Sequence, residues 1–531
     1  MSPSRYPLTH TGVELMRNPM WTKSIRKAGL FTLLLVSPAL GFVACTDLTE
    51  VPTSAIAPEN FYKNEEEVLG ALASVYAQLR QTVEAYYNVS EVSADEYIVP
   101  TRGTDWYDGG RWLELDRQLW GANSPTGLDD LNSAWLNLFS GVARANGALA
   151  AIDNVTFPDK AIVQAELRTL RAFYYFLLQD LFGGVPIVET TILVPPDGNT
   201  RAEVFNFIES ELNAARTVLP PTWPADMHGR MTKGAADAIL ASLYLNAEVF
   251  AGTVSATGLT RGPARWQDAV TAADRIINSG VYSLAEPWRS NFTYDNHLSP
   301  EIILTVKFLN TSGLGLNFLM RALHYNQYTP QPWNGFATIA ETYFAFDPDD
   351  QRRQIFLEGR QFHLVTGVPV NDNQGNPLVF TPDIPNPDNT FDYTGVRIAK
   401  WAVDPGHVQQ DAGNDFANFR LADIYLIKAE ALNELGRTAE AIALVNQIRA
   451  RVFTIPEPIA AATPAAFRDV ILRERLFELT AEGKRRQDQI RHGKFLLPWF
   501  NKLQREPYRI LMPIPQQQRD ANPNLVQNAG Y

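Results

Sequence analysis

The sequence predicts a mainly α-helical protein in which pairs of helices form a scaffold and a loop-rich insertion carries short β-hairpins. Two observations lead to this fold class. Apolar residues recur at helical spacing towards both ends of the chain, and proline-rich, turn-prone sequence separates these helical parts. The chain has 531 residues, of which 45% are hydrophobic and 20% charged, so it can bury a large core and extended disorder is excluded.

The N-terminus has the pattern of a secretion signal. Three basic residues precede the apolar stretch 28–43, which is too short for a membrane span and has the length of a signal-peptide core. Ala44 follows, and the next residue, Cys45, is the only cysteine of the chain. The arrangement predicts a bacterial lipoprotein signal, residues 1–44, and a lipid-anchored tether, residues 45–63. The alternative is an ordinary cleaved signal with a leftover cysteine.

Composition excludes several classes of function. The formal net charge of −12 argues against nucleic acid as a partner, because phosphate binding needs a surplus of Lys and Arg on one face. The single cysteine excludes a disulfide framework and a cysteine-rich metal site. The acidic run 347–350 lacks the spacing of a calcium loop, and we interpret it as a capped turn. The sequence therefore predicts neither a metal nor any other cofactor.

The N-terminal helical part is expected to cover residues 64–280. Asn64 and Glu67 resemble a capping box in front of the first apolar stripe. Residues 235–277 resemble a tetratricopeptide unit whose turn carries an insertion at 251–263. The expected helices are 64–79, 129–152, 161–182, 201–218, 232–250 and 264–279.

The middle of the chain, residues 281–415, is the expected loop-rich insertion. Its stretch 369–413 holds six prolines and several turn-prone Asn and Asp residues. Short β-type runs occur at 301–308, 360–365 and 396–403. Loops mounted on a rigid scaffold are the usual place for binding residues, so we expect the function here.

The C-terminal helical part, residues 416–531, repeats the helix-pair pattern. Residues 418–450 read as a second tetratricopeptide unit with Gly436 in its turn. Because the two units are far apart in sequence, helices of both halves are expected to stack into one scaffold. The charged residues of 473–491 are interpreted as an exposed helix face with pairs at i,i+4. The expected helices are 416–435, 438–451 and 466–482.

Four stretches occur together in a specific order. They are Cys45 with Pro52, 170–176 with 181–186, 420–431 with 473–491, and the tail 513–531. In this order they resemble the SusD/RagB family of outer-membrane nutrient-uptake lipoproteins. The resemblance implies a scaffold of tetratricopeptide-like helix pairs and a partner, a TonB-dependent SusC-like outer-membrane transporter that the lipoprotein covers as a lid. It also implies capture of an oligosaccharide or a peptide at the cell exterior, without catalysis.

Two aromatic-rich loops are candidates for ligand binding. Sugar rings pack on exposed aromatic faces, and their hydroxyls need a few amide or carboxylate partners. The alternative is that these rings wedge the loops onto the scaffold. The predicted ligand-binding residues are Asp105, Trp106, Tyr107 and Trp112 in the first loop, 101–120, and Tyr328, Trp333 and Asn334 in the second loop, 325–334.

Two other functions stay open at this point. The first is a glycoside hydrolase whose carboxylates lie on unrecognised loops, because an acidic chain always offers carboxylate pairs. The second is a helical-repeat scaffold for outer-membrane assembly, which would have protein partners other than a transporter. Sequence signatures of serine hydrolases, zinc proteases and phosphate-binding loops are missing, so no catalytic residue is predicted.

Overall fold

The computed structural model describes residues 63–531, except for 192–193, 456 and 461. The predicted signal, the tether up to residue 62 and the lipidation site Cys45 lie outside the described residues. Among the residues described, no helix is long and apolar enough to cross a membrane.

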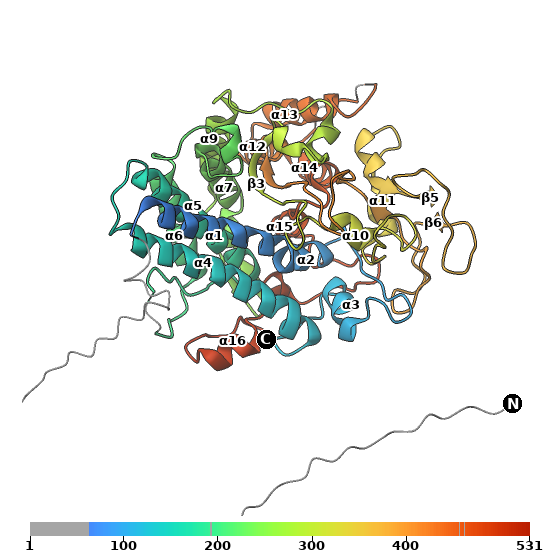
Figure 1. The fold of residues 1–531 in the computed structure, drawn as a ribbon, viewed down its shortest axis with the longest axis horizontal. Coiled ribbons are helices and arrows are strands. Elements are labelled where there is room, and N and C mark those ends of the chain that lie inside the picture. The colour runs from blue at the N-terminus through green and yellow to red at the C-terminus, as the bar shows by residue number, and fades with distance from the viewer. Residues whose placement is uncertain (1–62, 192–193, 456, 461) are drawn as a thin grey trace, which may run out of the picture. The chain divides into compact units, whose positions relative to one another are not determined.

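Four helices of the N-terminal part pack side by side. They are α1 (Glu65–Gln78), α4 (Asn132–Ile152), α5 (Lys160–Phe182) and α6 (Arg201–Ala215), and Figure 1 shows them grouped together. Helix α5 lies between α4 and α6 and is buried along most of its length, because its apolar residues face neighbours on several sides.

The ends of these helices follow from local sequence. The Asn64 side chain accepts the Glu67 N–H at 3.0 Å and caps α1. Only this half of the predicted capping box forms, because the Glu67 carboxylate accepts the N–H of Lys63 rather than that of Asn64. Thr200 and Glu203 form a full capping box on α6. Helix α5 ends at Gly183, whose φ of 77° lies in the left-handed region that glycine tolerates best.

Two helix pairs with tetratricopeptide-like packing join the halves of the chain. The first pair is α7 (Lys233–Leu245) with α9 (Trp266–Ile277), and the second is α12 (Leu421–Glu434) with α13 (Thr438–Ala450). Helix α12 packs on α9 and α7, and on the following α14 (Pro464–Leu479). The predicted stacking of helices from both halves is therefore confirmed.

The insertion in the first pair forms a small hairpin. Its strands are β1 (Thr253–Ser255) and β2 (Gly258–Thr260), which pair in antiparallel register. The remaining α-helices of the described residues were not predicted as separate elements. They are α2 (Ala85–Val92), α3 (Arg111–Asp116), α8 (Ala247–Phe250), α10 (Phe318–Ala322), α11 (Ala340–Ala345), α15 (Arg485–Arg491) and α16 (Gln516–Ala521).

Short antiparallel strand pairs connect segments of the middle of the chain with one another and with the start of the C-terminal part. Strand β3 (Ile302–Val306) pairs with β8 (Phe416–Arg420). The prediction of helix for 416–420 was wrong, because the partner strand lies more than 100 residues earlier and only pairing reveals the extended backbone. The other pairs are β4 (Phe356–Leu357) with β7 (Arg397–Ile398), and β5 (Gly359–Arg360) with β6 (Val379–Phe380).

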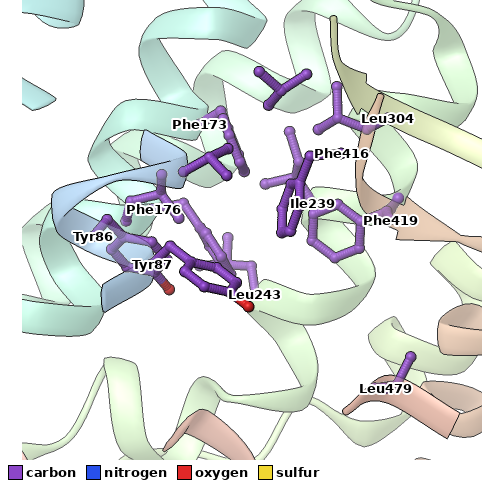
Figure 2. Close-up of a cluster of buried hydrophobic side chains, with 14 of the residues drawn as sticks. Tyr86, Tyr87, Phe173, Phe176, Ile239, Leu243, Leu304, Phe416, Phe419 and Leu479 are labelled. Atoms are coloured by element: carbon purple, nitrogen blue, oxygen red, sulfur yellow. The ribbon is translucent and has the colours of Figure 1, made fainter. Parts of the chain in front are cut away.

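The hydrophobic core joins segments from all parts of the chain. Figure 2 shows Tyr87 of α2 and Phe176 of α5 on one side of a cluster, with Leu243 of α7 and Phe416 and Phe419 of β8 also contributing. All of these side chains are buried. Fully burying an aromatic or Leu side chain contributes about 1.5–3 kcal/mol, so this cluster holds helices and strand together.

Most charged residues of 473–491 are buried, so their assignment to an exposed helix face was wrong; Arg473 is exposed and Lys484 is partly exposed. Glu478 of α14 accepts hydrogen bonds from Arg420 at 2.6 Å and from Arg352 at 3.0 Å. Glu482 accepts from Arg420 as well, at 2.8 Å, and both carboxylates are almost fully inaccessible. Buried charges must be paired, and here the partners come from β8 and from the loop-rich middle rather than from the same helix.

A second buried pair of carboxylates holds the turn after α14. Glu91 accepts the Gly483 N–H at 2.5 Å, and Glu96 accepts the Ala481 N–H at 2.7 Å. Burial raises the pKa of Glu91 to about 7. Burial and then the neighbouring charge of Glu91 raise the pKa of Glu96 well above its usual range.

This pair gives a prediction for pH-dependent stability. The folded state keeps a proton that the unfolded chain releases above about pH 4.5, so this stabilisation is complete below that pH and is lost as the pH rises through about 7. In the Glu91→Gln variant the residue cannot ionise. Relative to this variant, the wild-type free energy of unfolding should fall by roughly 1 kcal/mol for each pH unit between pH 5 and 7. Chemical denaturation across this range checks the prediction, and parallel curves for the two proteins would contradict it.

Candidate ligand-binding site

The structure brings the two predicted aromatic loops together into one place. The Trp106 indole Nε1 donates to the Trp333 carbonyl oxygen at 2.6 Å, although the residues are 227 positions apart. The Tyr325 hydroxyl donates to the Asp105 carboxylate. Five of the seven predicted residues, Asp105, Trp106, Tyr107, Trp333 and Asn334, therefore belong to these two directly bonded segments.

The Trp106 side chain lies between the two loops. Its φ of 61° is unusual for a tryptophan and turns the ring inward. The ring lies edge-on to Phe336 at 5.7 Å and against the backbone of Gly335, where a Cβ would come within 2.3 Å of the indole. Only glycine fits at that position. Trp106 is thus half-buried, and its role in holding the loops is visible in its contacts.

Trp112 lies next to Trp106 on helix α3, not on a loop. Only 3% of the side chain is exposed. Its Nε1 donates to the Asp108 carboxylate at 2.8 Å, and the Arg111 guanidinium lies 4.2 Å from its ring centroid. The ring of Trp106 packs against it with a centroid distance of 5.6 Å. The ring supports the loop from below and has no free face for a ligand.

Asn334 is fully buried and anchors the second loop. Its φ of 53° is in the left-handed region, which Asn tolerates better than most residues. The side chain donates to the Asp392 carbonyl at 2.8 Å and accepts from Arg397 at 2.8 Å. Arg102 donates to the Asn334 carbonyl oxygen at 2.8 Å. All these groups face inward, so Asn334 positions the loop.

Tyr328 belongs to the second loop, but its side chain is buried and is not part of the exposed face. It packs with Met320 and Leu323 in a small separate core cluster and is 7% exposed. Its ring lies 5.0 Å from that of His407. Burial, with the charge of Asp404, raises the pKa of Tyr328 to about 12. Trp333 covers the same cluster from the outside, which fixes the position of its indole.

The outward face of the joined loops carries aromatic rings and hydrogen-bonding groups. Tyr107 is 59% exposed, Trp333 and Tyr325 are partly exposed, and the Asp105 carboxylate is exposed. Burial and the bond to Asp105 raise the pKa of Tyr325, so its phenol stays protonated and donates. Flat apolar faces next to a fixed carboxylate and phenol can accommodate a sugar ring.

Two more aromatic residues at this face were not predicted. Phe391, which is 61% exposed, and Tyr393 stack at 5.3 Å with an interplanar angle of 4°. The Phe391 carbonyl oxygen accepts from Arg102, and Thr390 N–H donates to the Thr101 carbonyl oxygen at 2.9 Å. These bonds attach the segment to the first loop. The signal in the sequence was an aromatic pair inside a stretch rich in Pro, Asn, Asp and Thr.

The described residues include no group of three or more His, Cys, Asp or Glu side chains arranged to hold a metal ion. The acidic run 347–350 forms a capped turn, as predicted. Asp347 accepts the Asp349 N–H at 2.8 Å, and Asp350 accepts the Arg352 N–H at 2.9 Å.

Comparisons with known proteins agree with this architecture. A family model described as "SusD family" matches residues 340–500, and one described as "Starch-binding associating with outer membrane" matches residues 63–245. Together the two matches span more than half of the chain.

Relatives and solved structures match along nearly the whole length. A SusD-like protein of Formosa agariphila is 26% identical over 550 residues, which is 96% of this chain and 100% of that protein. The starch-binding protein SusD of Bacteroides thetaiotaomicron is 24% identical over 84% of this chain and 85% of its own. Surface glycan-binding protein A of Bacteroides thetaiotaomicron, solved with laminarihexaose, has a TM-score of 0.71 at 21% identity and covers 88% of this chain and 99% of its own. The chain belongs to the SusD/RagB family.

Proposed function

We propose that this protein captures an oligosaccharide on the face formed by the two joined loops and does no chemistry on it. The observation that carries the proposal is the grouping of Tyr107, Trp333 and Tyr325 with the exposed Asp105. The loops that carry them are joined by hydrogen bonds and held from beneath by the buried Arg102. Rigid aromatic surfaces lose little entropy on binding, which suits a capture protein. Trp106, Trp112 and Asn334 act as positioning residues beneath this surface, and Tyr328 supports Trp333 from the neighbouring cluster.

The names of the similar proteins support a glycan rather than a peptide. One relative is a starch-binding protein, and one solved neighbour holds laminarihexaose. The family model for the N-terminal part is described as starch-binding and associated with the outer membrane. In our proposal the protein presents the captured glycan to a TonB-dependent SusC-like transporter, which it covers as a lid at the cell exterior.

Anchoring through Cys45 is part of the proposal and is open to a direct test. In the Cys45→Ser variant no acyl chain can be attached, and the protein should move from the membrane fraction to the soluble fraction. Cell fractionation followed by immunoblotting measures the distribution. Retention of the variant in the membrane fraction would show that the anchor lies elsewhere.

The capture function is tested by binding of the mature chain to immobilised polysaccharides and protein digests, with product analysis on the same samples. We expect retention by at least one glycan and no new reducing ends. Release of shorter sugars, lost on replacing one carboxylate, would establish a hydrolase instead. Binding of protein digests alone would assign the surface to peptides. If neither polysaccharides nor digests bind, the remaining candidate is a helical-repeat scaffold for outer-membrane assembly.

A further inference from the structure

We infer that the joined-loop face selects uncharged oligosaccharides and rejects polyanionic glycans and acidic peptides. The inference rests on the proposed function, because it names the class of glycan that the same face accepts. The charges around the face support the inference.

Lys and Arg are absent from the segments that form the face. The sequence contains 46 Lys and Arg residues, yet none occurs in 103–110, 322–351 or 361–396. These segments hold the partly or fully exposed aromatic residues Tyr107, Tyr325, Trp333, Phe391 and Tyr393. Recognition of uronate or sulfate groups relies on guanidinium and ammonium donors, so these segments lack the side chains that a polyanion requires.

The arginines directly beneath the face are buried and bonded to the loops. Arg102 is buried, and it donates to the carbonyl oxygens of Asn334 at 2.8 Å and Thr394 at 3.0 Å. Arg397 is fully buried and donates to the Asn334 side chain at 2.8 Å and the Asp392 carbonyl at 2.9 Å. Burial lowers the pKa of Arg102 to about 10. These guanidinium groups hold the loops in place and cannot reach a ligand on the surface.

Carboxylates neutralise the arginines at the border of the face. Arg111 lies 2.5 Å from Asp130, 3.4 Å from Asp129 and 3.7 Å from Asp108. An arginine shared between three carboxylates has no surplus positive charge for a ligand.

The second border arginine, Arg117, makes a bidentate pair with Asp388 at 2.6 and 3.0 Å. Bidentate guanidinium–carboxylate pairs use both available donor directions, so this arginine is also unavailable to an anion.

The charges that do face solvent are negative. Asp105 and Asp383 are exposed, and the side chains of Asp108 and Asp129 are 49% and 59% exposed. A sulfate or uronate placed among these carboxylates experiences repulsion over about one Debye length, which is roughly 8 Å at physiological salt. Sugar hydroxyls, by contrast, can donate to the same carboxylates. The face therefore favours neutral, hydroxyl-rich chains.

The test is affinity electrophoresis of the mature chain at pH 8 and low salt. Gels contain either a neutral polysaccharide (laminarin, pullulan or galactomannan) or a polyanion (alginate, polygalacturonate or ι-carrageenan). We expect at least one neutral glycan to retard the protein with an affinity at least tenfold above that of every polyanion, and added salt to leave this retardation unchanged.

Charge is then added beside the face in the variant Thr104→Lys/Asn389→Lys. Both residues are exposed: Thr104 lies in the first loop, and Asn389 precedes Thr390, whose N–H donates to the Thr101 carbonyl oxygen. This variant should gain retardation by alginate that disappears with added salt, and it should keep its affinity for the neutral glycan. The matched control, Thr271→Lys/Ala439→Lys, adds the same charge to exposed positions on α9 and α13 and should gain nothing.

The outcomes separate this inference from the proposed function. Salt-sensitive retardation of the wild-type protein by a polyanion would overturn the selection of neutral glycans while leaving glycan capture intact. A lysine variant that gains no alginate binding would also overturn it, because charge would not be the reason for rejection. Binding of no polysaccharide at all would overturn both.

Discussion

The variants Tyr107→Ala and Trp333→Ala are each expected to weaken glycan binding by about 2 kcal/mol, roughly 30-fold in Kd. The reason is the loss of an exposed apolar face on which a sugar ring packs, while the loop backbone stays locked by Arg102 and Asn334. Isothermal titration calorimetry with the glycan that binds in the panel gives the change in affinity. The melting temperature of Tyr107→Ala should be unchanged, because 59% of that side chain is already exposed in the folded state.

Two controls make this prediction specific. Tyr294 has a similar exposure, 50%, but precedes the short helical turn Asn296–Leu298, and Tyr294→Ala should bind the glycan like the wild type. Trp106→Ala should lower the melting temperature, because the indole fills the space against Gly335 and Phe336. If Tyr107→Ala and Trp333→Ala both retain full affinity, the face described here is not where the glycan binds.

The second large effect is expected in the buried ion network. Glu478 accepts hydrogen bonds from Arg352, Arg420 and Arg451, and from the Trp288 indole at 3.0 Å. Burial opposes its ionisation, but the surrounding guanidinium groups outweigh burial and hold the pKa of Glu478 well below its usual range. Removing this charge takes away the carboxylate that these three guanidinium groups share, although each keeps another carboxylate partner among Asp350, Glu301 and Glu482.

The Glu478→Gln variant should therefore lose about 3–5 kcal/mol of folding stability, the usual cost of breaking a buried pair. Urea denaturation monitored by circular dichroism measures it. The control is Glu440→Gln, which removes an exposed carboxylate paired with Arg437 at 2.7 Å and should leave the midpoint unchanged. Equal midpoints for the wild type and Glu478→Gln would mean that the network is not needed for stability.

Helices with strong local signals could be predicted from the sequence, whereas elements defined by distant partners could not. The apolar stripe and Asn64 cap of α1 are local, and the predicted helix matches the structure closely. Residues 416–420 are extended only because β3 pairs with them. The charges of α14 repeat at a helical spacing that also fits an exposed face, and their partners, such as Arg352 and Arg420, are far away in sequence.

The candidate site was predicted in pieces. The sequence indicated both aromatic loops, but not that Trp106 and Trp333 would meet, because that contact depends on the packing of the whole scaffold. Burial of Trp112 and Asn334 could not be read from loop composition either, since glycine-containing turn sequence precedes Trp112 and follows Asn334. Phe391 and Tyr393 were missed because their stretch reads as turn sequence, and only its bonds to the first loop place it at the face.

The central claim is that the joined loops hold the glycan, and the most direct measurement is a crystal structure of the mature chain with the oligosaccharide that binds most tightly in the panel. We predict sugar rings against Tyr107 and Trp333, with a hydroxyl bonded to the pair formed by Asp105 and Tyr325. Sugar bound elsewhere, with these rings uncovered, would contradict it.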